Sequence, residues 1–141
     1  MANIHDPEEN IKVDVAVTQQ TIVSGSNAAI TALTYFRLRH YDLVWFFVFT
    51  GARTGAASLT CQMYQRLGAA GGTATLRDAA TVATADAVDT SLWARGEELT
   101  VNTGNDRVGI RLTETASQNF VVGAICLRLK ARYKQATLLT T

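Results

Sequence analysis

The side chains that could carry out catalysis are few in this sequence, and their spacing does not group them. Acid–base catalysis of the glycosidase type needs two carboxyl groups that face each other across a cleft. Glu97 and Glu98 are adjacent, so on a strand they would point to opposite faces. The other acidic pairs fall in turn-like stretches, where carboxylates normally cap or are solvated: Asp86 with Asp89, and Asp106 with Glu114. We therefore expect no enzymatic activity from these groups.

Histidine and cysteine give no better candidates for a metal ligand or a nucleophile. His5 lies in a polar N-terminal stretch, and His40 stands at the head of a strand-like run. Zinc sites combine several such ligands at short spacings, and a catalytic cysteine needs a base beside it. Cys61 and Cys126 are far apart in strand-like contexts, which favours buried free thiols over a bridge between strands or subunits. The sequence predicts neither a metal nor a cofactor.

Composition is typical of one globular domain with a full apolar core. The chain has 141 residues, of which 48% are hydrophobic and 18% charged. A formal net charge of +1 gives no reason to expect general nucleic-acid binding. The sequence has no run of eighteen apolar residues, and its N-terminal stretch is polar and acidic. These features predict a soluble protein made in a cytoplasm, with no membrane contact.

The stretch from Tyr41 to Gln65 is the strongest structural signal. Its first part is rich in β-branched and aromatic residues, and Gly51 and Gly55 then mark a turn. The second part alternates, with Leu59, Cys61 and Met63 on one face and Thr60, Gln62 and Tyr64 on the other. We interpret the whole stretch as a β-hairpin.

The first arm of this expected hairpin is apolar on both faces. Leu43, Trp45, Phe47 and Phe49 share one face, and Val44, Phe46 and Val48 share the other. Exposing an apolar side chain forfeits about 1.5–3 kcal/mol relative to burying it. We therefore expect a central strand, with one face on the opposing sheet and the other on a loop, a helix or a partner subunit. We assign the partner contact to Val44, Phe46 and Val48.

The rest of the chain supplies further alternating runs between turns of Gly, Asn, Asp and Ser. Residues 28–39 could form a helix after an Asn27 or Ser26 cap, but their β-branched and aromatic content favours a strand. Trp93 is expected to be an anchor. The remaining expected strands are 11–18, 97–101, 107–114 and 120–133. Together the runs predict an all-β fold, an antiparallel β-sandwich with jelly-roll connectivity over residues 11–133. Residues 1–10 and 134–141 are expected to be terminal arms.

Basic residues alternate on two of these strands. Arg37 and Arg39 share one face of their strand, and Arg128, Lys130 and Arg132 share one face of the last strand. If the two strands are neighbours, they form a basic strip that could dock on an acidic protein surface; a solvated outer face is the alternative. Base stacking on Tyr35 and Tyr133 would lack any recognisable nucleic-acid motif.

Three stretches resemble tailed-bacteriophage virion structural proteins. They are Phe-Thr-Gly-Ala-Arg-Thr-Gly-Ala-Ala-Ser-Leu-Thr from Phe49, Leu-Thr-Val-Asn-Thr-Gly-Asn-Asp-Arg-Val-Gly-Ile-Arg-Leu-Thr from Leu99, and Phe-Val-Val-Gly-Ala-Ile-Cys-Leu-Arg-Leu-Lys-Ala-Arg-Tyr from Phe120. The resemblance covers roughly residues 11–133. It implies a jelly-roll-like capsid decoration, or cement, protein that binds the major capsid protein on the virion surface as a trimer or dimer.

Two other functions fit the same strands. A β-sandwich associated with the neck, tail or fibre of a virion would share every feature described above. A carbohydrate-binding β-sandwich would stack sugars on Trp45, Trp93 and Tyr64. The capsid decoration protein is the leading hypothesis, because apolar strand faces without catalytic groups predict a protein that works by packing against other polypeptides.

Overall fold

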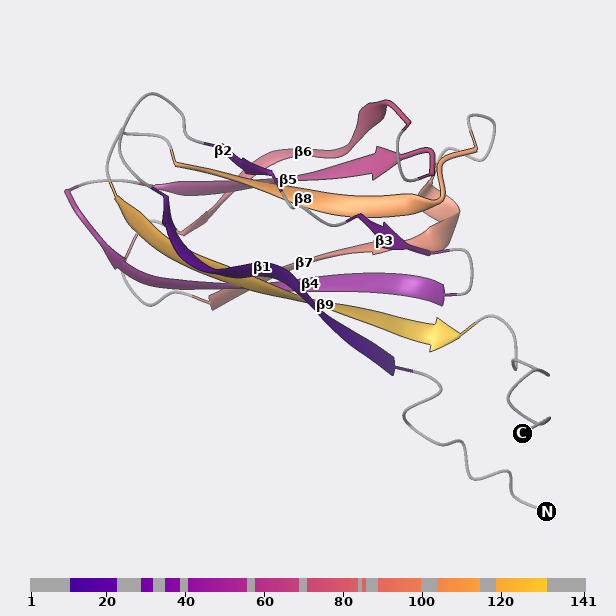
Figure 1. Ribbon diagram of the computed structural model, residues 1–141, viewed down its shortest axis with the longest axis horizontal. Coiled ribbons are helices and arrows are strands. Elements are labelled where there is room, and N and C mark those ends of the chain that lie inside the picture. Colours follow the sequence, from indigo (N-terminus) through magenta and orange to yellow (C-terminus); the bar gives the residue numbers. More distant parts are fainter. Residues whose placement is uncertain are drawn as a thin grey trace, which may run out of the picture.

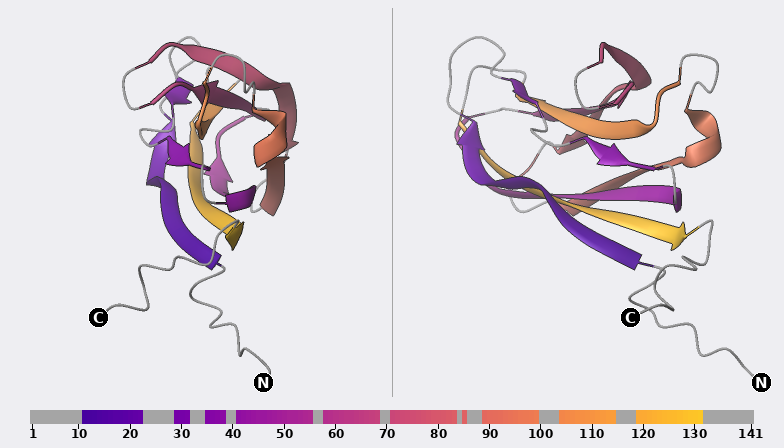
Figure 2. Two further views of the ribbon diagram at one scale, coloured as in Figure 1. Left: turned by 90° about the vertical axis from the view of Figure 1, so that its right-hand side faces the viewer. Right: turned by 45° about the vertical axis from the view of Figure 1, so that its right-hand side comes forward.

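The protein is a sandwich of two antiparallel β-sheets (Figure 1). The computed structural model describes residues 11–22, 29–31, 35–38, 41–55, 58–68, 71–83, 85, 89–99, 104–114 and 119–131. The expected arms, residues 1–10 and 134–141, lie outside these described residues. In the right-hand view of Figure 2, the indigo β1 and the yellow β9 lie in one layer and the orange β8 lies in the other.

One sheet has four strands in the order β1-β9-β4-β7, and the other has β2-β8-β5-β6 with β3 paired to β8. A single 3₁₀ turn, η1 (Gly96–Glu98), is the only helical element in the described part of the chain. The strands are β1 (Ile11–Ile22), β2 (Ala29–Thr31), β3 (Phe36–Arg37), β4 (Tyr41–Arg53), β5 (Leu59–Arg66), β6 (Thr73–Ala83), β7 (Asp89–Arg95), β8 (Arg107–Glu114) and β9 (Phe120–Ala131).

The pairing of strands is that of a jelly roll. The first strand pairs with the last, β1 with β9, and the next pairs nest inside it: β2 with β8, β4 with β7, and β5 with β6. Successive pairs alternate between the two sheets. A long hairpin rolled into two layers has this order, so the predicted antiparallel jelly-roll sandwich is confirmed.

The expected hairpin from Tyr41 to Gln65 is wrong, although both of its arms are strands. β4 pairs with β7 and β9, whereas β5 pairs with β6 and β8 in the opposite sheet. The chain therefore crosses from one sheet to the other between Arg53 and Leu59. Gly55 has a φ of 64°, a conformation that glycine adopts easily and that allows a tight reversal of the chain. Such a reversal can lead either to a strand of the same sheet or to a strand of the opposite sheet. Turn residues thus predicted the reversal but not the sheet that each arm joins.

β4 is a central strand, as expected, but its two faces are reversed relative to our assignment. Val44, Phe46 and Val48 are fully buried between the sheets, so they are core residues and not available to a partner subunit. The ring of Phe46 packs on that of Phe36 from the opposite sheet, with ring centroids 5.9 Å apart. The face that carries Trp45, Phe47 and Phe49 is the one outside the sandwich.

The core is built from the inner faces of the central strands. The predicted alternation of β5 and β8 is confirmed, with Leu59, Cys61 and Met63 buried opposite Val108, Ile110 and Leu112. On β9 the buried residues are Phe120, Val122, Ala124, Cys126 and Arg128. Within residues 28–39 the structure has the two short strands β2 and β3, which agrees with the predicted strand conformation, whereas Tyr35 and Leu38 lie outside both strands.

Two local predictions are wrong. Glu97 and Glu98 belong to the 3₁₀ turn η1 and not to a strand, because the Glu98 carboxylate accepts a hydrogen bond from the backbone N–H of Arg95 at 2.8 Å. Trp93 is 48% exposed on the outer side of β7 and is no core anchor. Within the part of the chain that the structure describes, no helix is long and apolar enough to cross a membrane.

Candidate interface on the outer face

The most unusual surface is the outer face of the sheet β1-β9-β4-β7, which we call the outer face. Strand register places its side chains in rows across the sheet. One row holds Val13, Leu127, Trp45 and Trp93. The rows on either side hold Ile11, Leu129 and Leu43, and Val15, Ile125 and Phe47, and a fourth row holds Gly123 and Phe49.

These rows are apolar and open to solvent. The exposed fractions are 44% for Ile11, 61% for Val13, 64% for Val15 and 40% for Phe49. Removing apolar side chains from water stabilises a protein. The sandwich buries the inner face of these strands, whereas the outer rows can be buried only by another surface. A contiguous apolar face of this kind marks a contact site for another molecule.

Aromatic residues are concentrated at the centre of the outer face. The rings of Trp45 and Phe47 lie 4.7 Å apart between centroids. Trp45 and Trp93 are cross-strand neighbours, so the indoles stand beside each other. The indole N–H of Trp45 is buried and has no hydrogen-bond partner among the described residues. Large rigid aromatic side chains are the residue type that dominates protein interfaces.

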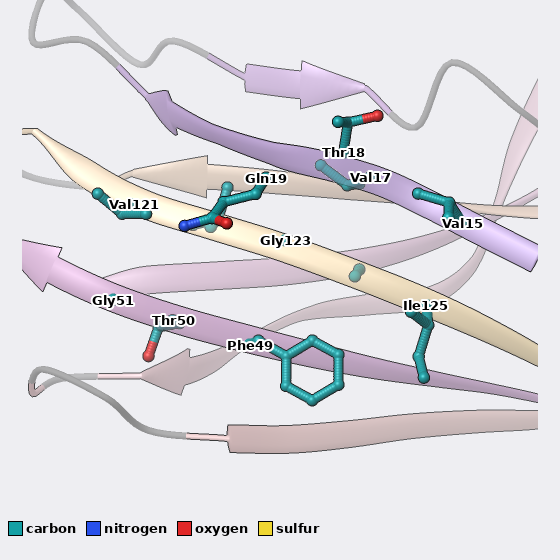
Figure 3. A pocket seen from close by; sticks show the side chains of 12 residues that line it. Val15, Val17, Thr18, Gln19, Phe49, Thr50, Gly51, Val121, Gly123 and Ile125 are labelled. Carbon is teal, nitrogen blue, oxygen red and sulfur yellow. The ribbon is translucent and has the colours of Figure 1, made fainter.

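An open groove of about 520 Å³ lies next to Phe49 on this face (Figure 3). It is floored by Gly123 and Gly51 and walled by Val15, Gln19 and Ile125. In Figure 3 the two glycines leave the strands bare, whereas Phe49 and Ile125 project beside them. A Cβ on Gly123 would lie 3.6 Å from the Cα of Gln19, an ordinary contact. A side chain at residue 123 would therefore meet no backbone clash at its Cβ, and it would stand in the lining of the groove.

β1 shapes the far side of the groove. Its pairing with β9 is interrupted by register shifts between Val15 and Val17 and between Val17 and Gln20. Such bulges turn side chains to the other face. Val15, before the first shift, points outward like Ile11 and Val13, whereas after it both Ala16 and Val17 are buried. A bulge at a sheet edge also prevents simple strand addition, so a partner would contact this face through side chains.

Among the described side chains, the charged residues of the outer face stand at its border, on β7. Arg95 lies over the ring of Trp93 with 5.9 Å between the guanidinium carbon and the ring centroid, and its Nη1 lies 3.3 Å from Oε1 of Glu97. Asp89 at the other end of β7 is exposed. A polar rim around an apolar centre is the usual anatomy of a protein interface.

The outer side of the opposite sheet has a different chemistry. Arg111 lies over the ring of Tyr64 at 4.8 Å, and Arg66 lies over the ring of Tyr35 at 5.0 Å. Tyr64 and Gln62 are hydrogen-bonded through their side chains. Polar and charged side chains that contact one another in this way are typical of a surface exposed to solvent. The two outer sides of the sandwich are therefore unequal, and the apolar one is the candidate site.

The basic strip was predicted on the condition that its two strands are neighbours, and the described residues of those strands lie in different sheets. Arg37 is in β3, which pairs with β8, whereas Arg128 is in β9 of the other sheet. Arg128 points into the end of the core and its Nη1 donates to the backbone carbonyl of Arg37 at 3.1 Å. Arg37 itself pairs with Asp106 at 3.1 Å and is 46% exposed. Arg39 and Arg132 lie outside the described residues, as does the side chain of Lys130.

The groups considered for catalysis are dispersed. Glu114 is buried, Asp106 accepts from the backbone N–H of Gly68 at 2.9 Å, and Asp89 lies at the border of the outer face. Burial would raise the pKa of Glu98, but the N–H of Arg95 and the guanidinium of Arg77 outweigh it and lower that pKa. His5, His40 and Asp86 lie outside the described residues. Among described residues, no three of His, Cys, Asp or Glu gather as metal ligands do.

Cys61 and Cys126 are free and buried, in opposite sheets. Burial raises the pKa of the Cys61 thiol to about 12. Burial also raises the pKa of the Cys126 thiol to about 12, although Arg128 opposes the shift. The prediction of buried free thiols is confirmed. A thiol of this kind stays protonated and is a poor nucleophile.

The three aromatic residues considered for sugar stacking do not come together. Trp45 and Trp93 are neighbours on the outer face, whereas Tyr64 lies on β5 in the other sheet. The outer face itself was missed as a site by sequence reasoning. Its signal in the sequence is the alternation of Ile11, Val13 and Val15 and of Ile125, Leu127 and Leu129, a pattern that does not say whether the apolar set faces the core or the outside.

Comparisons with known proteins find likeness in structure but not in sequence. No protein-family model matches the chain, and no curated protein matches it. A structure of the infectious bursal disease virus Gx strain superposes with a TM-score of 0.55 at 11% identity, over 87% of this chain and 34% of that one. The VP2 subviral particle of infectious bursal disease virus gives a TM-score of 0.56 at 9% identity, over 85% of this chain and 32% of that one.

These likenesses are of fold alone, given the low identity. This chain spans about a third of the length of the viral chains that it matches. A third match, the infectious bursal disease virus particle, has a TM-score of 0.51 at 11% identity, over 85% of this chain and 31% of that one. The shared part is the β-sandwich, so the likeness agrees with the jelly-roll topology that the strand pairing gives.

Proposed function

We propose that this protein is a virion structural protein that decorates an assembled capsid. The observation that carries the proposal is the outer face, four rows of apolar side chains left uncovered on a jelly-roll sandwich. A face of this kind is stabilised only by contact with another surface. The likeness to chains from infectious bursal disease virus particles supports the same class of function.

The partner that we propose is the major capsid protein, with this protein bridging neighbouring capsid subunits. β1 begins and β9 ends at the same end of the sandwich, because Ile11 and Leu129 are paired. The strands that precede and follow the expected arms, residues 1–10 and 134–141, thus lie next to each other, and we assign the lattice contacts to these two arms. Contact by two adjacent segments would add buried area between capsid subunits and so stabilise the shell.

We also propose that the protein has no enzymatic activity. Both cysteines are buried with raised pKa values, which disfavours a nucleophilic role. Two of the carboxylates considered for acid–base work are paired with arginines, Asp106 with Arg37 and Glu98 with Arg77. These observations support packing against other polypeptides, and not catalysis, as the role that we propose.

The location of this chain in the parent particle tests the proposal. The particle would be purified, the copy number of the chain measured by quantitative mass spectrometry, and the recombinant protein mixed with capsids that lack it. Binding in a copy number that matches the capsid lattice is the expected result. A few copies confined to the neck, tail or fibres would overturn decoration in favour of that second virion location.

A further inference from the structure

We infer that the outer face is the contact surface between two copies of this chain, related by a two-fold axis that places Phe49 of each copy in the groove of the other. The inference rests on the proposed function, because it names the partner of the surface on which that function depends. It is carried by the shape of the face, because one exposed aromatic side chain stands directly beside a hollow that is large enough to hold an aromatic ring.

The projecting side chain and the hollow are in register. Phe49 of β4 and Gly123 of β9 are cross-strand partners, and the groove opens over Gly123. Phe49 is 40% exposed, so much of its ring is uncovered within a single copy. A groove of about 520 Å³ has room for an aromatic ring, which occupies less than that volume. The face therefore carries both halves of an interlocking contact.

Two-fold symmetry brings these halves together. In an isologous dimer, residue i of one copy contacts residue j of the other and the reverse contact forms at the same time. An axis that runs along the strands between β4 and β9 exchanges those two strands. It places Phe49 over the partner subunit's Gly123, and Trp45 over the partner subunit's Leu127. One operation thus fills both grooves.

The size of the face is adequate for a reversible dimer. Four strands about 4.8 Å apart and four rows about 6.8 Å apart project to about 500 Å². The accessible area of a ridged face exceeds its projection, which brings it toward the about 800 Å² per partner of a standard interface. No charged side chain stands in the rows from β1, β9 and β4, since Arg95 and Asp89 lie on β7. Packing two such faces would bury no unpaired charge from these three strands.

The first experiment measures the mass of the full-length chain in solution by light scattering and sedimentation over a range of concentrations. A dimer is expected for the natural sequence. The Gly123→Leu variant fills the groove and is expected to weaken dimerisation by about 10- to 100-fold. The matched control is Gly72→Leu, because nothing lies within 4 Å of a Cβ at that position and the added side chain meets open space.

Two further variants keep the test decisive. Phe49→Ala removes the projecting ring without adding bulk, and it is expected to weaken dimerisation even if Gly123→Leu folds poorly. The double variant Phe49→Ala with Gly123→Leu is expected to recover part of the affinity lost in Gly123→Leu, because the smaller residue 49 makes room for Leu at 123. Circular dichroism checks that each variant keeps its sheets.

A monomer at every concentration would overturn the inference, and so would a dimer that ignores Gly123→Leu and Phe49→Ala. If the control variant Gly72→Leu also lost the dimer, the assignment of the dimer contact to the groove would be overturned. Capsid binding separates this inference from the proposed function. A monomeric chain that still binds capsids refutes the dimer alone, whereas a dimer that never binds capsids refutes decoration alone.

Discussion

Arg128 of β9 and Asp14 of β1 form an ion pair, with Nη2 2.7 Å from Oδ2, at one end of the core. The Arg128 side chain is only 10% exposed. Its guanidinium also lies over the ring of Tyr41 at 5.0 Å and donates to the backbone carbonyl of Arg37. One cation thus ties the first strand, the last strand and a strand of the opposite sheet together where the sandwich would otherwise be open.

Removing the carboxylate is expected to destabilise this end of the fold. Asp14→Ala leaves a largely buried guanidinium without its counter-ion, and we expect the free energy of unfolding to fall by about 2–4 kcal/mol. Urea unfolding followed by tryptophan fluorescence measures it. The double variant Asp14→Leu with Arg128→Met removes both charges and should recover much of that loss, because an apolar pair needs no compensation. Equal stability of Asp14→Ala and the natural protein would contradict the structural role.

The faces of β4 give a second prediction, in which neighbouring residues of one type should differ. Phe46 is fully buried between the sheets, so Phe46→Ala should lower the free energy of unfolding by about 3–5 kcal/mol. Phe49 stands on the outer face, and Phe49→Ala should cost about 1 kcal/mol or less in a single copy. Urea unfolding at low protein concentration compares them. The reverse order would mean that the faces are as we first assigned them from sequence.

The core faces of β5 and β8 were predicted correctly, because each of these two strands has one polar face. Thr60 and Gln62 alternate with Leu59 and Cys61, so only one face of β5 can be the core. A shift of one residue would bury the polar set, which makes the assignment unambiguous. β8 follows the same rule, with Arg107 and Arg111 on the outer side.

Strands with two apolar faces could not be oriented from sequence. On β4 both sets are large and apolar, and the choice of Val44 over Trp45 as a core residue depends on the opposite sheet. On β9 the charge of Arg128 suggested an outer position, whereas its pairing with Asp14 lets it face inward. The pairing of the strands could not be predicted from the sequence either. β4 pairs with β9, which is far away along the chain, and a glycine turn after β4 is compatible with either sheet.

Gly109 provides a prediction about close packing. A Cβ at this position of β8 would lie 2.9 Å from Cδ1 of Tyr35, closer than real Cβ contacts. Tyr35 is held in turn by the guanidinium of Arg66, which lies 5.0 Å from its ring centroid. Gly109→Ala should therefore lower the free energy of unfolding by about 1–3 kcal/mol.

Thermal or urea unfolding of Gly109→Ala should be read beside Gly72→Ala, whose added methyl group meets open space. The Gly72 variant should change stability by less than about 0.5 kcal/mol. Adding Tyr35→Ala to Gly109→Ala removes the ring that the methyl group meets. If the single Gly109 variant is as stable as the natural protein, the ring of Tyr35 does not pack where the structure places it.

The two buried thiols predict a chemical difference between the folded and unfolded chain. Cys61 and Cys126 are free, buried and protonated well above neutral pH, since burial raises the pKa of each to about 12. An alkylating reagent needs an exposed thiolate. At pH 8 the folded protein should therefore resist labelling, and the same protein in urea should label at both cysteines. Mass spectrometry counts the labels, and rapid labelling of the folded chain would contradict burial.

The same thiols make stability depend on alkaline pH. In the unfolded chain each thiol has its ordinary pKa of 9.0 and loses its proton as the pH rises through that value, whereas the folded chain keeps the proton until about pH 12. The folded state then binds more protons, so the free energy of unfolding falls as pH rises above 9, by about 1 kcal/mol per pH unit for each thiol. Cys126→Ala removes one of these contributions while all other titrating groups remain. Urea unfolding between pH 8 and pH 10.5 should give a shallower decline for Cys126→Ala than for the natural protein, and identical slopes would show that this thiol ionises equally in both states.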